Sequence, residues 1–92
     1  MKRVTLPHLD TASAIALKAL GFLAADSSQM QRFMALSGID VDTLRSEADE
    51  PHILASVLDY LSQDDSLLMT FAANAGLDPG AIQPALHVLQ NA

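Results

Sequence analysis

Apolar residues recur along the chain at the three- and four-residue spacing of α-helices, and no stretch shows the strict alternation of a half-buried strand. Acidic or hydroxyl residues stand just before these apolar segments, where helices typically begin. The spacing therefore predicts an all-α fold of six helices. They are expected over about residues 10–25, 26–37, 40–48, 49–63, 64–75 and 78–90.

Aspartates and glycines mark the ends of the predicted helices. A carboxylate at a helix start accepts hydrogen bonds from free backbone N–H groups and is stabilised by the helix dipole. Gly38 and Gly76 stand where two of the helices end, a place at which the chain commonly turns left-handed. The residues predicted to act as structural caps are Asp10, Asp26, Gly38, Asp40, Asp64, Gly76 and Asp78.

The chain repeats itself at an offset of 38 residues. Such a repeat predicts a compact six-helix bundle of two similar three-helix units, about residues 10–48 and 49–90, that pack their apolar sides into one core. Residues 1–9 are then an N-terminal arm before a single domain of residues 10–92. The identical pairs are Leu20 and Leu58, Leu23 and Leu61, Asp26 and Asp64, Ser28 and Ser66, Phe33 and Phe71, Ala35 and Ala73, Gly38 and Gly76, and Asp40 and Asp78.

The largest apolar side chains are expected to dominate the core, because burying a leucine or phenylalanine is worth about 1.5 to 3 kcal/mol. Pro84 lies inside the last predicted helix, where it should kink or split that segment. The side chains expected at the centre of the core are Leu20, Phe22, Leu23, Phe33, Leu58, Leu61 and Phe71.

Charge is unevenly distributed along the chain. The net charge is −6, all five basic residues precede residue 46, and the seven acidic residues of 46–92 have no Lys or Arg among them. Such a half repels nucleic-acid phosphates and anionic lipids and attracts basic proteins. The chain has no cysteine and no apolar run of the roughly 18 residues that a membrane span needs. We expect a cytoplasmic protein that binds neither nucleic acid nor membrane.

Patterns that would indicate catalysis or metal binding are weak. The serines belong to helix starts, in no nucleophile elbow. Asp64 and Asp65 are neighbours at a cap, unlike a catalytic pair held across a cleft. His8, His52 and His87 lack the spacing of metal ligands. We therefore expect no enzyme activity, no cofactor and no metal.

Binding through shape is the function that remains. Met30 and Met34 are one helical turn apart, and methionine surfaces adapt to varied partners. The sequence favours a protein–protein interaction or accessory module with a basic partner, and it also allows a homodimer in which Lys2 and Arg3 meet the acidic half of a neighbour. The candidate partner surface consists of Met30, Met34, Asp59, Asp64 and Asp65.

Two other functions stay open. One is a small-ligand or enzymatic site between the two helical units. The other is nucleic-acid binding, because six residues have the spacing of a helix-turn-helix, but its second helix offers no Lys or Arg for phosphate contacts. The residues with this spacing are Ala72, Gly76, Leu77, Asp78, Ile82 and Gln83.

Four stretches together are similar to a known family. They are the run ALGFLAAD at residues 19–26, the stretch from Arg32 to Asp40, the pair Leu44 and Arg45, and the run VLDYL at residues 57–61. They resemble an uncharacterised family of short bacterial all-helical proteins, a domain of unknown function, over residues from about 12 to 88. The resemblance implies an all-helical fold in the bacterial cytoplasm and brings no activity or catalytic residues with it.

Overall fold

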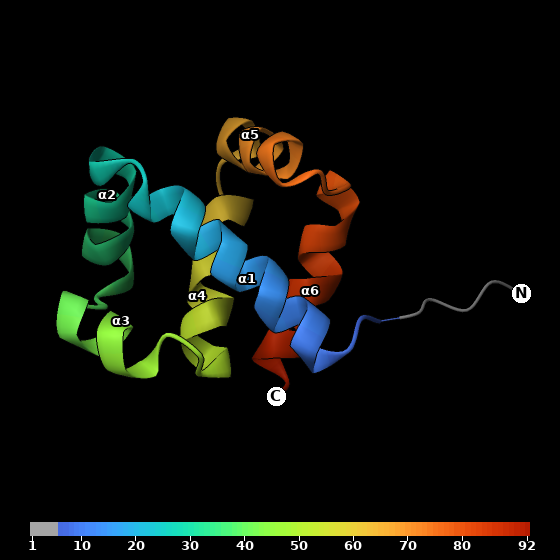
Figure 1. Ribbon diagram of the computed structural model, residues 1–92, viewed down its shortest axis with the longest axis horizontal. Coiled ribbons are helices and arrows are strands. Elements are labelled where there is room, and N and C mark those ends of the chain that lie inside the picture. Colours follow the sequence, from blue (N-terminus) through green and yellow to red (C-terminus); the bar gives the residue numbers. More distant parts are fainter. Residues whose placement is uncertain (1–5) are drawn as a thin grey trace, which may run out of the picture.

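Six α-helices and one short 3₁₀-helix make up residues 6–92, the part of the chain that the computed structural model describes (Figure 1). No strand forms within these residues, so the predicted all-α fold is confirmed. The helices are α1 (Leu9–Ala24), α2 (Ser27–Ser37), α3 (Val41–Glu47), α4 (Pro51–Ser62), α5 (Asp65–Ala75) and α6 (Ile82–Gln90), with the 3₁₀-helix η1 (Pro79–Ala81) before α6.

Aspartates begin four of these helices, as predicted. Asp26, Asp40, Asp64 and Asp78 each stand at the N-cap and accept a backbone N–H from the first turn, at donor–acceptor distances of 2.8 to 3.3 Å. The hydrogen bonds from the backbone N–H and the hydroxyl of Thr43 hold the pKa of the Asp40 carboxyl below its ordinary value. Ionised Asp40 therefore stabilises the fold above its ordinary pKa, and this stabilisation is lost as the pH falls through the lowered pKa.

Helix α1 starts without an aspartate cap. His8 takes the N-cap position in an extended conformation, and its carbonyl accepts the N–H of Ala12 at 3.0 Å, so that Leu9 is already helical. Asp10 lies in the first turn, where its charge still meets the positive end of the helix dipole. The prediction that Asp10 caps this helix is therefore wrong. Helix α1 includes Leu9, the last residue of the predicted arm 1–9, and residues 1–5 lie outside the described part of the chain.

Gly38 and Gly76 end α2 and α5 in the left-handed conformation, with φ of 75° and 67°. The N–H of Gly38 donates to the Met34 carbonyl at 2.9 Å. After Gly76, the N–H of Leu77 reaches back to the Ala72 carbonyl at 2.9 Å, the hydrogen bond that closes a Schellman motif. A Cβ at either glycine would meet no atom within 4 Å, so backbone strain alone disfavours other residues there.

Replacing Gly38 or Gly76 with valine is expected to lower the free energy of unfolding by about 1 to 2 kcal/mol, because a residue with a side chain is strained in the left-handed region. Urea unfolding followed by circular dichroism measures the change. Gly21→Ala is the control, since Gly21 lies within α1 and has open space beside it. This variant should gain about 0.5 to 1 kcal/mol. Equal stability in all three variants would contradict the left-handed conformation of Gly38 and Gly76.

The last predicted helix is divided in two. Asp78 caps the short η1, and α6 starts separately at Ile82. Pro84 thereby falls in the first turn of α6, where a proline lacks only an N–H that has no helical partner. The split that Pro84 predicts is confirmed, and it lies just upstream of the proline because only the first turn accommodates this residue.

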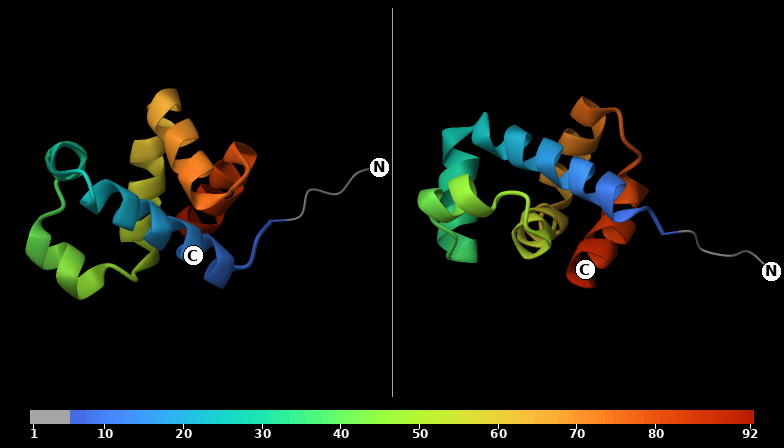
Figure 2. Two further views of the ribbon diagram at one scale, coloured as in Figure 1. Left: turned by 45° about the horizontal axis from the view of Figure 1, so that its top comes forward. Right: turned by 60° about the horizontal axis from the view of Figure 1, so that its bottom comes forward.

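The centre of the molecule is formed by α1, α4 and α6, which pack against one another (Figures 1 and 2). Ala12, Ala16 and Ala19 on one side of α1 have no exposed surface. Such small side chains leave room for the larger ones of the facing helices. Helices α2 and α5 each pack against both α1 and α4. The larger fully buried side chains are Leu23, Phe33, Leu54, Val57, Leu58, Leu61, Phe71, Ile82 and Leu89.

Five of the seven side chains expected at the centre of the core are buried, and two are not. Leu20 and Phe22 are half-buried and pack against the edge of the core, because the alanines of α1 and Leu23 occupy its inner side. The five buried side chains are Leu23, Phe33, Leu58, Leu61 and Phe71.

Two aromatic pairs connect the first half of the chain to the second. The ring of Phe22 in α1 lies against Phe71 in α5, and the ring of Phe33 in α2 lies against Tyr60 in α4. Both pairs have their ring centres 5.5 Å apart, within the favourable range for aromatic contacts. Helix α5 in the second half is thus in contact with α1 in the first half, and α2 in the first half is in contact with α4 in the second.

Candidate functional site

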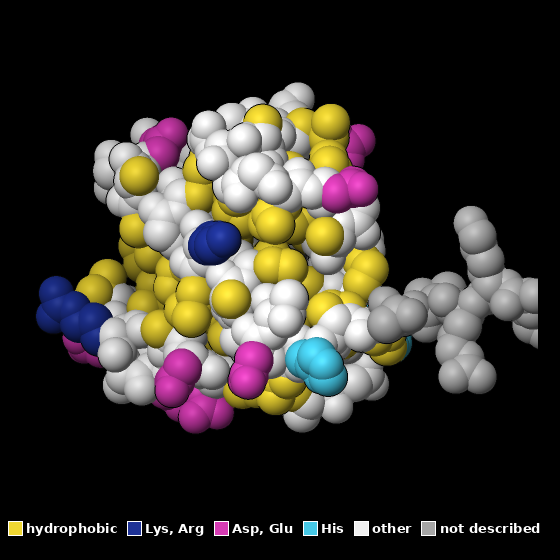
Figure 3. Space-filling model, turned by 45° about the vertical axis from the view of Figure 1, so that its right-hand side comes forward, with side chains coloured by type: hydrophobic (Ala, Val, Ile, Leu, Met, Phe, Trp, Pro, Cys, Tyr) yellow, Lys and Arg dark blue, Asp and Glu magenta, His cyan; other side chains and the backbone are white. Residues whose placement is uncertain are grey.

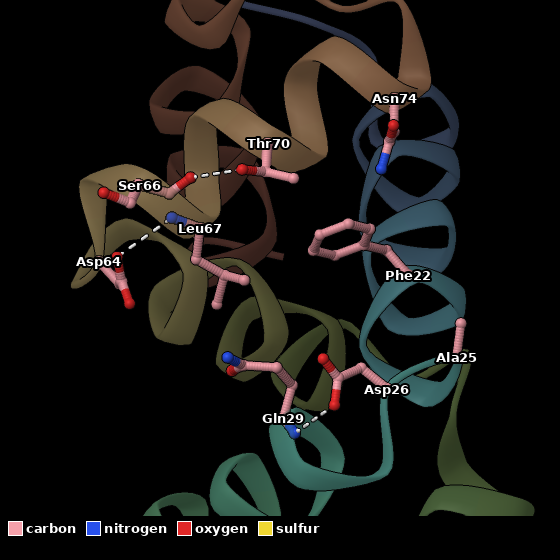
Figure 4. A pocket seen from close by; sticks show the side chains of 9 residues that line it. All are labelled: Phe22, Ala25, Asp26, Gln29, Asp64, Ser66, Leu67, Thr70 and Asn74. Carbon is pink, nitrogen blue, oxygen red and sulfur yellow. Dashed lines mark hydrogen bonds between the residues drawn. The ribbon is translucent and has the colours of Figure 1, made fainter.

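An open groove of about 520 Å³ lies where the end of α1 meets the starts of α2 and α5 (Figure 4). Residues from both halves of the chain contribute to it. In Figure 4 the Phe22 ring points from α1 into the space between the helices, and the side chain of Asp26 points toward the same space. The lining residues are Phe22, Ala25, Asp26, Gln29, Asp64, Ser66, Leu67, Thr70 and Asn74.

The two carboxylates of the groove are the N-caps of α2 and α5. Asp26 Oδ1 accepts the N–H groups of Ser28 and Gln29 at 3.0 and 3.3 Å. Asp64 Oδ1 accepts the N–H of Leu67 at 3.1 Å. Each carboxylate is therefore held in place by its own helix, and the hydrogen bonds use only one of its two oxygens.

Gln29 is fixed from the side of α4. Its Oε1 accepts a hydrogen bond from the Tyr60 hydroxyl at 2.8 Å, and the glutamine is half-buried. On the opposite wall, the Thr70 hydroxyl donates to the Ser66 carbonyl at 2.9 Å, within α5. Both polar side chains thus make a hydrogen bond within the protein.

Phe22 and Leu67 supply the apolar part of the groove, and both are half-buried. The Phe22 ring is steadied by Phe71, with an angle of 56° between the ring planes. Phe22 and Asn74 also line a second hollow of about 460 Å³, together with Lys18, Phe71 and Ala75. Phe22 and Asn74 therefore border two depressions of the surface.

The groove can accept a cation or a hydrogen-bond donor that carries an apolar stem. Among residues 6–92, no lysine, arginine or histidine lines it, so none of these neutralises the two carboxylates from within. Within residues 6–92 no three histidine, aspartate or glutamate side chains gather in a way that could hold a metal ion. Over the same residues, none of the helices has both the length and the apolar character to cross a membrane.

The structure separates the residues of the predicted partner surface. Asp64 lines the groove, whereas its exposed neighbour Asp65 does not. Asp59 accepts a hydrogen bond from the Gln63 side chain at 3.1 Å and lines a third hollow. This hollow has a volume of about 210 Å³ and is formed by Leu36, Ser37, Ser56, Asp59, Tyr60 and Gln63.

The predicted methionine surface is only partly free. Met30 and Met34 are half-buried and pack against the core, so much of the pair is taken up by the fold. Lys2 and Arg3, expected to meet the acidic half of a neighbour, lie outside the described residues.

Sequence reasoning missed Phe22, Gln29 and Asn74 as groove residues. The sequence predicts Asp26 only as a helix cap. The sequence marks Asp26 and Asp64 as matching caps at the 38-residue offset, but no signal in it places the two around one groove.

A family model covers nearly the whole chain. The model described as "Protein of unknown function (DUF3572)" matches residues 9–92. Neither a curated protein nor a solved structure matches the chain at a significant level.

Proposed function

Because the chain belongs to the family of proteins of unknown function DUF3572, whose description gives no activity, we propose a function from the groove itself. The chain acts as a non-enzymatic interaction module that binds a basic segment of a partner protein. The observation that carries this proposal is the pairing of two capping carboxylates with an aromatic ring in one groove.

An arginine or lysine side chain suits this groove in shape and charge. Its aliphatic stem packs on apolar surface while its cation reaches polar groups, and hydrogen bonds between ionised partners are stronger than neutral ones. Phe22 and Leu67 would contact the stem, and the carboxylates of Asp26 and Asp64 would accept hydrogen bonds from the cation. The free oxygens of both carboxylates suit this task because their positions are already fixed.

The charge of the whole chain supports a basic partner. The net charge is −6, and residues 46–92 contain no Lys or Arg. A field of one sign raises the rate at which an oppositely charged partner arrives, and its effect falls as salt is added. The groove would then provide the specific contact after long-range attraction.

We also propose that the fold consists of two equivalent units related by the 38-residue offset. In support, α2 and α5 begin and end 38 residues apart, and their caps and final glycines correspond. The aromatic pairs are exchanged between units, since Phe22 corresponds to Tyr60 and Phe33 to Phe71. In each unit an aromatic ring of the first helix contacts a ring on the second helix of the other unit. This exchange is expected of two copies around an approximate twofold axis.

The hollows of the surface also support two units related by the 38-residue offset. Four residues of the second hollow correspond to four of the third at this offset. The groove itself contains two corresponding pairs, Asp26 with Asp64 and Gln29 with Leu67, so it would lie on the approximate axis between the units. The matching residues of the hollows are Lys18 and Ser56, Phe22 and Tyr60, Asn74 and Leu36, and Ala75 and Ser37.

The proposal is tested with a fluorescent peptide of alternating arginine and alanine, whose binding is followed by anisotropy. The double variant Asp26→Asn, Asp64→Asn keeps both caps, because asparagine caps helices about as well as aspartate. It removes the two charges of the groove and is expected to weaken binding by about tenfold or more. For the unchanged protein, salt raised to roughly 0.5 M should also weaken binding, since exposed charges are then screened within a few ångströms.

The matched control is Asp59→Asn, Asp65→Asn, which removes two acidic charges outside the groove. It should bind the peptide within about twofold of the unchanged protein. Equal weakening in both double variants would show that only the overall charge matters and would contradict the proposal. Free arginine that binds as tightly as the peptide would favour the small-ligand alternative.

A further inference from the structure

The outer side of α1 is exposed, and Asp10 and Lys18 are its charged residues. Opposite the buried alanines, its residues are mostly small or apolar, and Leu17 keeps 45% of its surface exposed. Figure 3 shows hydrophobic side chains spread over one face of the molecule around an isolated basic group. No atom lies within 4 Å of the place where Gly21 would carry a Cβ. The exposed residues of this outer side include Ala14, Leu17, Lys18, Gly21 and Ala24.

The charges on this side of α1 have a symmetric arrangement. Asp10 lies four residues before Ala14, and Lys18 lies four residues after it. All three are exposed. Residues at this spacing form one ridge along a helix surface. The ridge therefore has an acidic end, a small residue at its middle and a basic end.

From this ridge we propose that two copies of the chain associate through the outer sides of their α1 helices, in antiparallel orientation. In the commonest class of helix packing, ridges of this spacing from both helices lie side by side. With Ala14 of each copy at the twofold axis, Asp10 of one copy meets Lys18 of the other, twice. Leu17, beside the ridge, is covered in the same contact.

A second copy fits this surface better than an unrelated partner does. A ridge that runs from acid to base is complementary to itself when reversed, which is the requirement for a twofold-symmetric contact. A uniformly basic partner would match Asp10 and be repelled by Lys18. The contact also leaves the groove free, because neither Asp10 nor Lys18 lines it. The test of peptide binding and the test of self-association can therefore give different outcomes, and failure of one proposal does not imply failure of the other.

The test is sedimentation equilibrium of the full chain at concentrations up to about 1 mM, the weak end of specific association. Lys18→Glu is expected to raise the dimer dissociation constant by about tenfold or more, since both charge pairs become repulsive. The exchange variant Asp10→Lys, Lys18→Glu restores opposite charges and should recover most of the loss. Arg32→Glu, the same charge change at an exposed position of α2, should leave the constant within about twofold.

Apolar contact is tested separately. Leu17→Ser should weaken the dimer, and Leu36→Ser at the 68% exposed position in α2 should not. A chain that stays monomeric at the highest concentration, or a dimer that Lys18→Glu does not weaken, overturns the proposal. So does a dimer that dissociates when residues 1–5 are removed but withstands Lys18→Glu, since the N-terminal arm would then make the contact.

Discussion

Replacing Phe33 with alanine is expected to lower the free energy of unfolding by about 3 to 5 kcal/mol. Phe33 has no exposed surface, and its ring lies edge-on against Tyr60 at 5.5 Å. Removing it leaves a cavity between α2 and α4 and takes away the aromatic contact that joins the two halves of the chain. Phe71→Ala should cost a similar amount, because Phe71 is 1% exposed and makes the corresponding contact with Phe22.

Urea unfolding of both variants measures the change in the free energy of unfolding. An exposed residue on the same helix serves as the control for each variant. Leu36 on α2 and Met69 on α5 are 68% and 55% exposed. Their replacement by alanine should change stability by no more than about 0.5 kcal/mol. If Phe33→Ala were as harmless as Leu36→Ala, α2 would not be held to the core by this ring.

Replacing Ala16 with leucine is expected to destabilise the protein by about 1 to 3 kcal/mol, near the upper value. Ala16 has no exposed surface and belongs to the side of α1 that packs in the centre with α4 and α6. Three added carbon atoms have no free space there, so the helices must separate or side chains must leave their preferred rotamers. The thermal unfolding midpoint should fall accordingly.

Ala24→Leu is the control for this prediction, because Ala24 is exposed and lies on the same helix. Its unfolding midpoint should stay close to that of the unchanged protein, since leucine and alanine both favour helices. A stable Ala16→Leu variant would mean that α1 can shift away from α4 and α6 without loss, in conflict with a tightly packed centre.

The helices of this fold could be placed from sequence because their end signals are local. An aspartate such as Asp26 and a glycine such as Gly38 act on residues within one turn, so one window of sequence contains the whole cause. Asp10 shows the limit of this reasoning. A carboxylate is also favourable inside the first turn, and the sequence pattern is the same for both positions.

Burial was harder to predict, because it depends on elements far apart in the chain. Phe22 has the apolar character of a core residue, yet it lines a groove because the neighbouring positions of α1 face α4 and α6. Gln29 became a groove residue through a hydrogen bond to Tyr60, 31 residues away. Neither contact has a local sequence signal. Asp64 is therefore the one groove residue that the sequence analysis places in a candidate partner surface.

In the proposed function the groove aspartates have a double role, as helix caps and as acceptors for a cation, which restricts what can replace them. Serine or asparagine would still start α2 and α5 but would leave the groove without its charge. Glutamate would keep the charge but is a poorer match to the short reach from the N-cap to the first-turn N–H groups. Under the proposed function, aspartate is the residue that meets both requirements at positions 26 and 64, whereas asparagine would keep the caps and lose only the charge.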